Sequence, residues 1–494
     1  MLKSEFIKEG VERIIKITPN TDLIPAELTG MNNLFSFANI SDSKYDSLKA
    51  LINTTSRISV MDDTTKEELL RFIDPDFDID TPTGSLWFTG DIAEGKSFYI
   101  QVGSELNKSN SSSVFSNQYN SYGFNESSED LIDRCGLMNG SPKNDITYEQ
   151  TGQLGKSIKF GPTDSSRFEL EHMSYLSALE KISLVAVVKM PGDSNVFQWV
   201  YLQINKTKGA LVAYFSQHNY TFYVDNIPSD TYCLLVTTFD GTQDGAARIK
   251  TFVDAVENTN VIFGEYTDPG QTETSSYNFG EIGSFPSAPN NLEMDEFRIY
   301  DKTLSPDEIT LLYNQWFNNI NYWTITIQPI ITSVSKNGNI WTITGTGFLP
   351  DGSTEPTGTA CNVSFSVQSV TDTVLVISLG DNCRDGDQSI LLTNSDGESF
   401  LYDNNITIPA SLLVSDFINV SQYIDTGYNV VFTNTIISRI HLNTEGYVNV
   451  VGLGFSDHEA QALKLSAGKV HDIGGIHKIM SNDTERGLGI HVKI

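Results

Sequence analysis

A run of evenly spaced aspartates is the most conspicuous candidate for metal chemistry in the sequence. The segment FIDPDFDIDTPTG carries an acid at every second position: Asp74, Asp76, Asp78 and Asp80. Calcium prefers oxygen ligands, but an EF-hand loop begun at Asp76 needs glycine at its sixth position and glutamate at its twelfth. Those positions hold Thr81 and Trp87. We therefore expect a strand on which Ile73, Phe77 and Ile79 face the core and the four aspartates face water.

Aromatic residues concentrate in and near the segment VAYFSQHNYTFYVD, where rings could stack on the faces of sugars. The candidates for such carbohydrate contacts are Trp199, Tyr214, His218, Tyr220 and Tyr223. Alternating aromatic residues on paired strands more commonly fill a core or pack across the strands. Both interpretations stay open from the sequence.

The four cysteines are Cys135, Cys233, Cys361 and Cys383, and none belongs to a CxxC pair. The spacing excludes zinc-finger and thioredoxin-type motifs. Cys361 and Cys383 fall in one predicted domain and could form a disulfide. Two reduced core cysteines are an equally good interpretation.

The elements that must position these residues are mostly strands. Runs such as ISLVAVVKM, YCLLVTTFDGT and RIKTFVDAVEN, separated by Gly, Asn, Asp and Ser, are typical of antiparallel strands and hairpins. Two short helices are predicted, over residues 42–52 and 305–316. Ser305 is the expected N-cap of the second helix, with Pro306 at its first position and Glu308 completing a capping box. The predicted fold class is all-β with minor helix, built from tandem β-sandwich modules.

Composition and charge exclude several function classes. Acidic residues outnumber basic ones 62 to 32 in 494 residues, which gives a net charge of −30 and a pI near 4.5. Such a chain lacks the basic surface that nucleic acid or anionic lipid requires. No segment approaches the roughly 18 apolar residues of a membrane helix, so no membrane insertion is expected. The amino-terminal residues also lack the apolar run of a secretory signal.

Changes in composition divide the chain into four predicted domains. Residues 107–128 are rich in Ser and Asn and are predicted to form a linker or long loop. Further breaks fall at 316–325 and near Pro409. The predicted domains are 1–110, 111–320, 321–409 and 410–494.

The second domain carries the clearest resemblance. GKSIKFG, ISLVAVVKM, the TYCLLVTTFDGT and RIKTFVDAVEN pair with a turn at Asp240-Gly241, and MDEFRIYDKTLSPDEITLLYNQ follow in order. These segments resemble the LamG-like jellyroll family, which has the concanavalin-type lectin and glucanase fold. The resemblance implies a jellyroll but leaves function open, because members bind sugars, bind proteins, hydrolyse polysaccharides or act as structural modules.

One strand of this domain bears on catalysis. Laminarinase-type glucanases of the same fold carry three acids as E-x-D-x-x-E, and EMDEFR supplies Glu293 and Asp295 but has Arg298 in the third position. An arginine stays charged and cannot act as the general acid for a glycosidic oxygen. No catalytic residues are therefore assigned, and we expect the protein not to be an enzyme.

Calcium is the one cofactor that the resemblance leaves open, because many LamG-like modules bind it. The candidate ligands are Asp133, Glu126 and Asp295, although no spacing is diagnostic. For Asp295 we favour a structural role, holding the turn that follows its strand.

The flanking domains carry weaker resemblances. Residues 11–105, through segments such as SRISVMDD and GSLWFTGDI, resemble a small β-domain of unknown function that often precedes LamG modules. Residues 327–408, through QPIITSVSKNGNIWTITGTGF, resemble an IPT/TIG immunoglobulin-like domain, a spacer or adhesive sandwich. Residues 410–494 are predicted to form a small β-domain that serves as an assembly element.

The leading functional hypothesis is a bacteriophage virion structural protein. Tail fibres, head fibres and capsid decorations are strings of such β-modules, made in the host cytoplasm and exposed on the particle exterior after lysis. Its expected partners are other virion proteins, further copies of itself, trimeric by analogy with fibres, and weakly bound host glycans. A bacterial surface adhesin whose signal peptide is missing is the alternative, and a polysaccharide hydrolase is a third.

Overall fold

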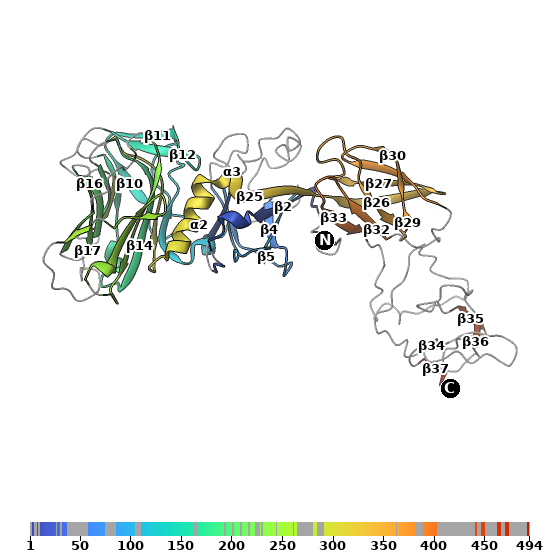
Figure 1. The fold of residues 1–494 in the computed structure, drawn as a ribbon. Helices are drawn as coiled ribbons and strands as arrows, with labels where there is room; N and C mark the ends of the chain where they lie inside the picture. The colour runs from blue at the N-terminus through green and yellow to red at the C-terminus, as the bar shows by residue number, and fades with distance from the viewer. Residues whose placement is uncertain are drawn as a thin grey trace. The chain divides into compact units, whose positions relative to one another are not determined.

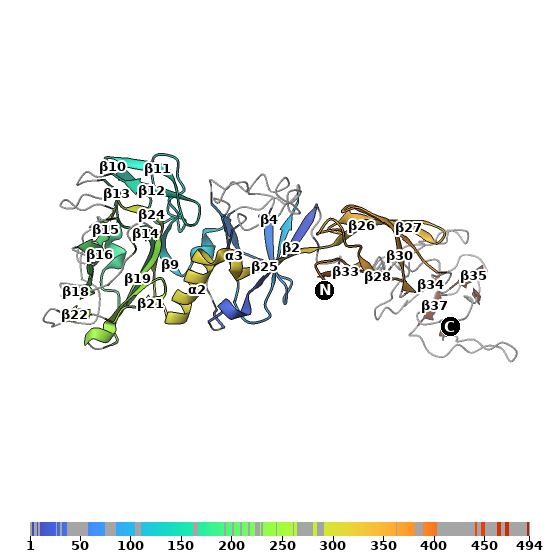
Figure 2. The ribbon, with the colours of Figure 1, turned by 45° about the horizontal axis from the view of Figure 1, so that its top comes forward.

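The computed structural model describes most of residues 11–36, 58–74, 85–103, 110–161, 166–191, 194–222, 228–263, 280–283, 291–380 and 389–402, with short strand segments nearer the chain ends. The chain divides into two compact units, Ile7–Gln328 and Met1–Phe6 with Pro329–Ile494. Strands make up most of the regular structure in both units, as Figures 1 and 2 show. The predicted fold class, tandem all-β sandwich modules, is therefore confirmed.

Two sheets form the N-terminal part of the first unit. The larger has the order β25-β2-β8-β4-β5, and the smaller has the order β3-β7-β6. The strands of the larger sheet are β2 (Arg13–Pro19), β4 (Ile58–Asp62), β5 (Glu68–Leu69), β8 (Phe98–Val102) and β25 (Trp323–Gln328). Those of the smaller are β3 (Asn32–Ser36), β6 (Arg71–Ile73) and β7 (Ser85–Thr89).

Strand β25 completes the N-terminal sheet although it follows some 200 residues of inserted chain. It pairs antiparallel with β2, from Ile14 opposite Gln328 to Pro19 opposite Trp323. The predicted boundary at 320/321 assigns this strand to the next domain, whereas its backbone hydrogen bonds place it in the N-terminal sheet.

The inserted segment forms two eight-stranded sheets. One has the order β10-β13-β23-β15-β16-β17-β18-β22, and the other β11-β12-β24-β14-β19-β20-β21 with β9 added beside β24. The first comprises β10 (Gly140–Lys143), β13 (Arg167–Leu170), β15 (Ser194–Trp199), β16 (Leu202–Thr207), β17 (Ala210–Phe215), β18 (His218–Phe222), β22 (Val261–Phe263) and β23 (Gly280–Gly283). The second comprises β9 (Gln118–Tyr122), β11 (Ile146–Thr151), β12 (Lys156–Phe160), β14 (Lys181–Lys189), β19 (Cys233–Asp240), β20 (Ile249–Val253), β21 (Val256–Glu257) and β24 (Glu293–Tyr300). The predicted pairing of the two strands that flank Asp240-Gly241 is confirmed as β19 with β20.

The second of these sheets is buried on both faces. Along β14, Leu184 and Ala186 lie in the core with residues of the opposing sheet, including Phe197. Val185 and Val187 lie in a separate core with residues of the N-terminal sheets. This explains why ISLVAVVKM is a continuous apolar run, because both faces of the strand are covered.

The helix α2 (Pro306–Phe317) begins as the sequence predicts. The Ser305 side chain accepts a hydrogen bond from the Glu308 N–H, and the Glu308 carboxylate accepts one from the Ser305 N–H, with Pro306 in the first turn. The helix buries Leu312 and Trp316 in the core shared with the N-terminal sheets. A single-turn helix α3 (Asn319–Tyr322) then leads into β25.

Two sequence interpretations need correction. Residues 107–128 are not only a linker, since they contain β9, in which Asn120 and Ser121 are fully buried. The Asn120 side chain is accommodated because it donates a hydrogen bond to the Asp133 carboxylate. Asp74 does not face water but is 2% exposed. Ile73 is buried as predicted, and residues 75–80 and the helix predicted over 42–52 lie outside the described residues.

The second unit contains a sandwich of two sheets. One has the order β1-β33-β32-β28-β29 and the other β26-β27-β31-β30. The first comprises β1 (Leu2–Lys3), β28 (Thr357–Ala360), β29 (Val363–Ser364), β32 (Ile390–Thr393) and β33 (Ser399–Tyr402). The second comprises β26 (Ile330–Asn337), β27 (Ile340–Thr346), β30 (Ser366–Val370) and β31 (Val374–Ser378). Trp341, Ile343, Leu375, Leu392 and Phe400 are among the buried side chains that the two sheets contribute.

The C-terminal segment is described only through five short strands. These are β34 (Ile440–His441), β35 (Gly446–Asn449), β36 (Ala462–Leu465), β37 (Val470–Ile473) and β38 (Val492–Lys493). The assembly role of residues 410–494 stays a prediction. Among the described residues, no helix combines the length and apolar character that crossing a membrane would require.

Candidate functional site

Strand β24, which carries the acidic residues predicted from sequence, contains a bulge. Val187 of β14 lies opposite Glu296 and Val188 lies opposite Met294, so Asp295 is the extra residue. C-terminal to the bulge, Phe297 and Ile299 point into the core between the two large sheets, and Tyr300 lies in the core shared with the N-terminal sheets. Since side chains alternate along a strand, Glu296 and Arg298 point to the same face as Tyr300.

That face holds four buried charged residues, Asp74, Arg134, Glu296 and Arg298, which we call the charge cluster. Arg134 Nε lies 2.7 Å from Asp74 Oδ1, and its Nη1 lies 2.7 and 2.9 Å from the two Glu296 oxygens. Arg298 Nε lies 2.7 Å from Glu296 Oε1. All four side chains are 4% exposed or less. Two carboxylates and two guanidiniums balance, which is the condition for burying charge at tolerable cost.

Aromatic rings enclose the charge cluster. The Arg298 guanidinium carbon lies 4.1 Å from the centre of the Trp87 ring and 4.6 Å from that of Trp316. Phe115 lies 5.7 Å from the same carbon. Trp87 also places its indole N–H 3.3 Å from Asp74 Oδ2. The rings exclude water and offer the guanidiniums cation–π contacts, which strengthens the pairing inside.

Burial and pairing act against each other in the cluster. Burial raises the pKa of the Asp74 carboxyl, with Arg134 opposing the rise. Burial disfavours the charge of Arg134, but Asp74 and Glu296 outweigh it and the pKa of Arg134 is raised. The guanidinium is therefore held charged between two carboxylates, and removing it would leave both of them buried without a partner.

The charge cluster and the rings that enclose it come from separate parts of the unit. Asp74 follows β6 and Trp87 lies on β7, both in the smaller N-terminal sheet, whereas Arg134, Glu296 and Arg298 belong to the inserted segment. Trp316 comes from helix α2. These contacts and the shared core join the N-terminal sheets to the inserted pair of sheets. The face of β24 bearing Arg298 is thus an internal contact and presents no acid or base to a ligand.

The acids predicted on β24 have partners of their own. Glu293 lies with Oε2 3.2 Å from Lys189 Nζ and 3.2 Å from the Tyr232 hydroxyl. Asp295 is fully buried, and its Oδ2 accepts a hydrogen bond of 2.5 Å from the Leu154 N–H. Burial raises the pKa of Asp295 well above its ordinary value, with the hydrogen bond from Leu154 opposing the rise. Asp295 therefore fixes the turn that ends at Leu154, and not the turn that follows β24.

Asp133, the other predicted calcium ligand, is saturated with hydrogen bonds. It accepts five, at 2.9–3.1 Å, from the Asn120 amide and from the backbone N–H groups of Ser121, Cys135, Leu137 and Met138. A carboxylate offers about four lone-pair positions, so these donors leave little for a cation. In the part of the chain that the structure describes, no three His, Cys, Asp or Glu side chains gather as a metal site. Calcium binding stays a prediction without a described ligand set.

Glu126 lies close to Asp133 in the sequence, and its carboxyl group has a raised pKa. Its Oε1 accepts a hydrogen bond of 2.9 Å from the Ile132 N–H. Burial raises its pKa to about 7, with that hydrogen bond opposing the rise. Glu126 therefore titrates near neutrality.

Four of the predicted carbohydrate-contacting residues are spread over three strands of the first large sheet, from β15 in its interior to β18 beside the edge strand β22. Trp199 ends β15, Tyr214 lies on β17, and His218 and Tyr220 lie on β18. Tyr214 pairs with Asn219 and Tyr220 with Ala213, so the two tyrosines are not cross-strand neighbours. Tyr223 lies outside the described residues. The carbohydrate role of these residues stays a prediction.

Of the cysteines, Cys361 is disulfide-bonded, whereas Cys135 and Cys233 are in the thiol form. Cys383, the predicted partner of Cys361, lies outside the described residues. The interpretation of Cys361 as a reduced core cysteine is therefore wrong.

The sequence interpretation missed the charge cluster. Its members are 60 or more residues apart, except for Glu296 and Arg298, and only folding brings Asp74 to Arg134. One signal was available, because Glu and Arg alternate with Phe and Ile in EMDEFRIY, which places charge on one face of a central strand. A charged face on such a strand requires a charged partner elsewhere.

Comparisons with known proteins do not place the chain in a family. No family model matches it, and no curated protein matches it. Solved structures that share part of the fold include domain 4 of AbnA, an extracellular arabinanase from Geobacillus stearothermophilus, in complex with arabinotriose. It is 21% identical, covering 40% of this chain and 98% of that one, with a TM-score of 0.32. The receptor-binding domain of botulinum neurotoxin C/D mosaic serotype is 10% identical, covering 58% and 87%, with a TM-score of 0.33.

A Trypanosoma rangeli sialidase is 12% identical over 40% of this chain, with a TM-score of 0.31. The match spans only 33% of the sialidase. All three TM-scores are too low to support an argument about function. The resemblances to LamG-like and IPT/TIG domains therefore stay predictions, while the β-sandwich architecture that they imply is confirmed.

Proposed function

We propose that the protein is a structural component of a bacteriophage virion, a fibre or decoration protein that projects from the particle exterior. The observation that carries the proposal is the charge cluster. In laminarinase-type glucanases the strand that β24 resembles carries catalytic acids. Here Glu296 and Arg298 of β24 instead join the N-terminal sheets to the inserted pair of sheets. A module that must keep its shape while it projects from a particle benefits from such a rigid internal joint.

The charge of the chain supports the same role. A net charge of −30 keeps densely displayed copies soluble and repels neighbouring copies from one another. The disulfide at Cys361 is also consistent with exposure to an oxidising exterior, where such bonds persist. Weak contact with host glycans, multiplied over many copies, is the binding role that fits this display.

Particle composition tests the proposal. Phage particles released from a host that carries the gene are purified on a density gradient, and their proteins are identified by mass spectrometry. The proposal expects the chain to sediment with infectious particles at a fixed ratio to the major capsid protein. Recovery of the chain only in the soluble fraction would contradict it.

A bacterial surface adhesin is the second candidate, because the disulfide at Cys361 fits a cell surface as well as a virion. The two differ in where the protein is found. Fractionation of uninfected cells would recover an adhesin in the envelope fraction, whereas a virion protein would be absent until phage genes are expressed.

A further inference from the structure

The sandwich of the second unit has a depression along one edge, where the chain passes from one sheet to the other. Strand β29 belongs to the sheet of β28, and β30 belongs to the sheet of β31. Phe365 is the one residue between β29 and β30. Because both are edge strands, the two sheets part here and leave a cavity of about 750 Å³ that is open to solvent. We call it the edge depression.

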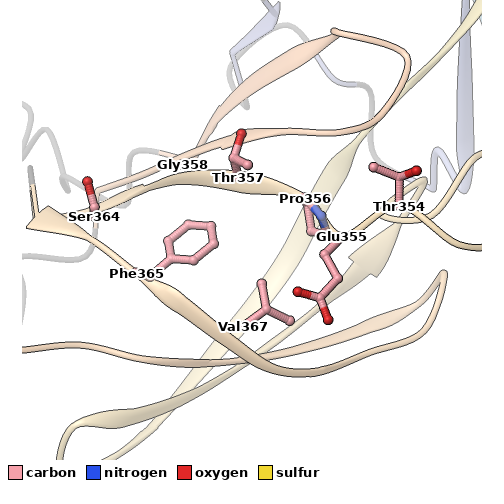
Figure 3. Close-up of a pocket in the computed structure, with 8 residues that line it drawn as sticks. All are labelled: Thr354, Glu355, Pro356, Thr357, Gly358, Ser364, Phe365 and Val367. Carbon is pink, nitrogen blue, oxygen red and sulfur yellow. The ribbon is translucent and has the colours of Figure 1, made fainter.

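The side chains of the edge depression combine one aromatic ring with several oxygen groups. Figure 3 shows Phe365 at its centre, between the strand that carries Thr357 and the strand that carries Val367. The lining includes Thr354, Glu355, Thr357, Ser364, Phe365 and Val367. Phe365 and Val367 are half-buried, whereas the hydroxyl and carboxylate residues are exposed. An apolar floor with a few polar groups at its rim is the usual composition of a small-molecule site.

The backbone around the edge depression is held in place. Asp351 accepts hydrogen bonds from the Ser353 and Thr354 N–H groups at 3.0 and 2.8 Å, which fixes the loop that leads to Glu355. On the far side, Cys361 has a φ of 54° and is disulfide-bonded in the turn between β28 and β29. A rigid frame of this kind lowers the ordering cost of binding.

Gly358 leaves the space that the Phe365 ring occupies. A Cβ at residue 358 would lie 3.0 Å from Phe365 Cε1 and would collide with the Leu391 carbonyl oxygen. The glycine therefore allows β28 to pack closely against β32 and allows the ring to lie against the strand. The ring and Gly358 both line the cavity.

We propose that the edge depression binds a neutral saccharide. Pyranose rings have an apolar face of C–H groups that can pack on an aromatic ring, and their hydroxyls pair with hydroxyl and carboxylate oxygens. The Thr357 and Ser364 hydroxyls can donate or accept, and the Glu355 carboxylate accepts. The carboxylate and the net charge of −30 disfavour sialylated, sulfated or phosphorylated ligands.

This site goes beyond the proposed function, since it lies in a different unit from the predicted glycan-contacting aromatics. Its failure would leave a virion role intact, and a virion role could fail while the site still bound sugar. The two are distinguished because particle composition tests the first and direct binding tests the second.

Saturation-transfer NMR on the full chain tests the site with neutral gluco-, galacto-, manno- and N-acetylglucosamine oligosaccharides. Sialylated and sulfated oligosaccharides, and a short apolar peptide, serve as competing ligand classes. The informative variants are Phe365→Ala and Glu355→Gln. Ile340→Ala is the matched control, because Ile340 is a 42% exposed apolar residue outside the depression.

We expect at least one neutral oligosaccharide to bind in the millimolar range. Phe365→Ala should weaken its binding at least tenfold, and Ile340→Ala should leave it unchanged. Glu355→Gln removes a charge at an exposed position without altering the fold, so it keeps the test valid should Phe365→Ala unfold. It should weaken neutral-sugar binding about threefold, the loss of roughly one hydrogen bond to a charged group that is partly replaced by water.

Three results would overturn the proposal. The first is that no neutral oligosaccharide binds. The second is that sugar binding survives both Phe365→Ala and Glu355→Gln, which would assign it to another module. The third is that anionic glycans or the apolar peptide bind more tightly than every neutral sugar.

Discussion

Replacing Arg134 with methionine is the sharpest perturbation of the charge cluster. Methionine keeps most of the length and volume of the side chain but removes its charge. The substitution leaves the Asp74 and Glu296 carboxylates, 3% and 1% exposed, with Arg298 as their sole remaining cationic partner in the cluster. The cluster then carries one uncompensated buried negative charge.

The expected decrease in the free energy of unfolding follows from the unfavourable free energy of burying that charge. Removing one member of a buried ion pair lowers the free energy of unfolding by about 3–5 kcal/mol. The aromatic rings of Trp87 and Trp316 keep water from entering the site, so we expect the upper part of that range. Lys250→Met is the control, because Lys250 is 43% exposed and pairs with Glu257, which is 38% exposed, so this ion pair is a surface interaction. It should cost no more than about 1 kcal/mol.

A compensating variant separates lost charge balance from lost packing. Asp74→Asn removes one negative charge, so the double variant Arg134→Met/Asp74→Asn leaves the neutral Glu296–Arg298 pair, whose atoms lie 2.7 Å apart. The double variant should be more stable than Arg134→Met alone by at least about 1 kcal/mol. Such a gain from a second substitution is not expected if Arg134 acts only by filling space.

The pH dependence of the single variant has a predicted sign. Burial already raises the pKa of Asp74, and loss of Arg134 raises it further. A carboxyl whose folded pKa exceeds its unfolded value favours folding at low pH, and that contribution is lost as the pH rises through the folded pKa. The stability deficit of Arg134→Met should therefore shrink between pH 7 and pH 5.

Urea unfolding followed by tryptophan fluorescence measures these differences in the full chain. Trp87 and Trp316 pack against the charge cluster, and Trp323 lies in the same unit, so the first unit dominates the signal. An Arg134→Met variant within 1 kcal/mol of the parent protein at pH 7 would refute the account of the cluster. So would a double variant less stable than the single one.

Three further predictions concern other residues of the same structure. Glu126→Gln should stabilise the protein near pH 8, because the folded pKa of Glu126, about 7, exceeds its unfolded value, and the contribution of this carboxyl to stability, up to about 3 kcal/mol, is lost as the pH rises from 4.5 through 7. The difference in stability between the variant and the parent protein should therefore change over that pH range in thermal melts, and a difference that is independent of pH would contradict this. Gly123→Ala should cost about 1–3 kcal/mol in urea unfolding, because its methyl would collide with Nη2 of Arg134, which the two carboxylates hold in place; a neutral effect would mean that the guanidinium can move. Ser305→Ala should cost about 1 kcal/mol by removing the N-cap of α2, and helix stability that is insensitive to it would refute the capping box.

Local features were predictable from the sequence. The strand runs, the capping box at Ser305 and the pairing of β19 with β20 depend on residues close in the chain, and all are confirmed. The strand order of the N-terminal sheet could not be predicted from the sequence. Strand β25 pairs with β2 although about 200 inserted residues precede it, and no local pattern encodes that pairing. Topology of this kind is set by long-range contacts.

The candidate site was predictable only in part. EMDEFRIY indicated a strand with charged residues, and Arg298 indicated that it lacks a third acid. Nothing near Asp74 in the sequence distinguishes it from the aspartates that follow it, so its burial beside Arg134 could not be inferred. The prediction that Asp74 faces water is wrong, because a carboxylate can be buried when a buried guanidinium compensates its charge.

The position of the protein in an intact particle would show whether it is a virion component. Cryo-electron microscopy of purified virions, with a Fab fragment against the second unit to mark the chain, would locate it. We expect Fab-labelled density on the particle exterior, projecting from capsid or tail in repeated copies. Unlabelled particles from a phage that encodes and expresses the chain would contradict it.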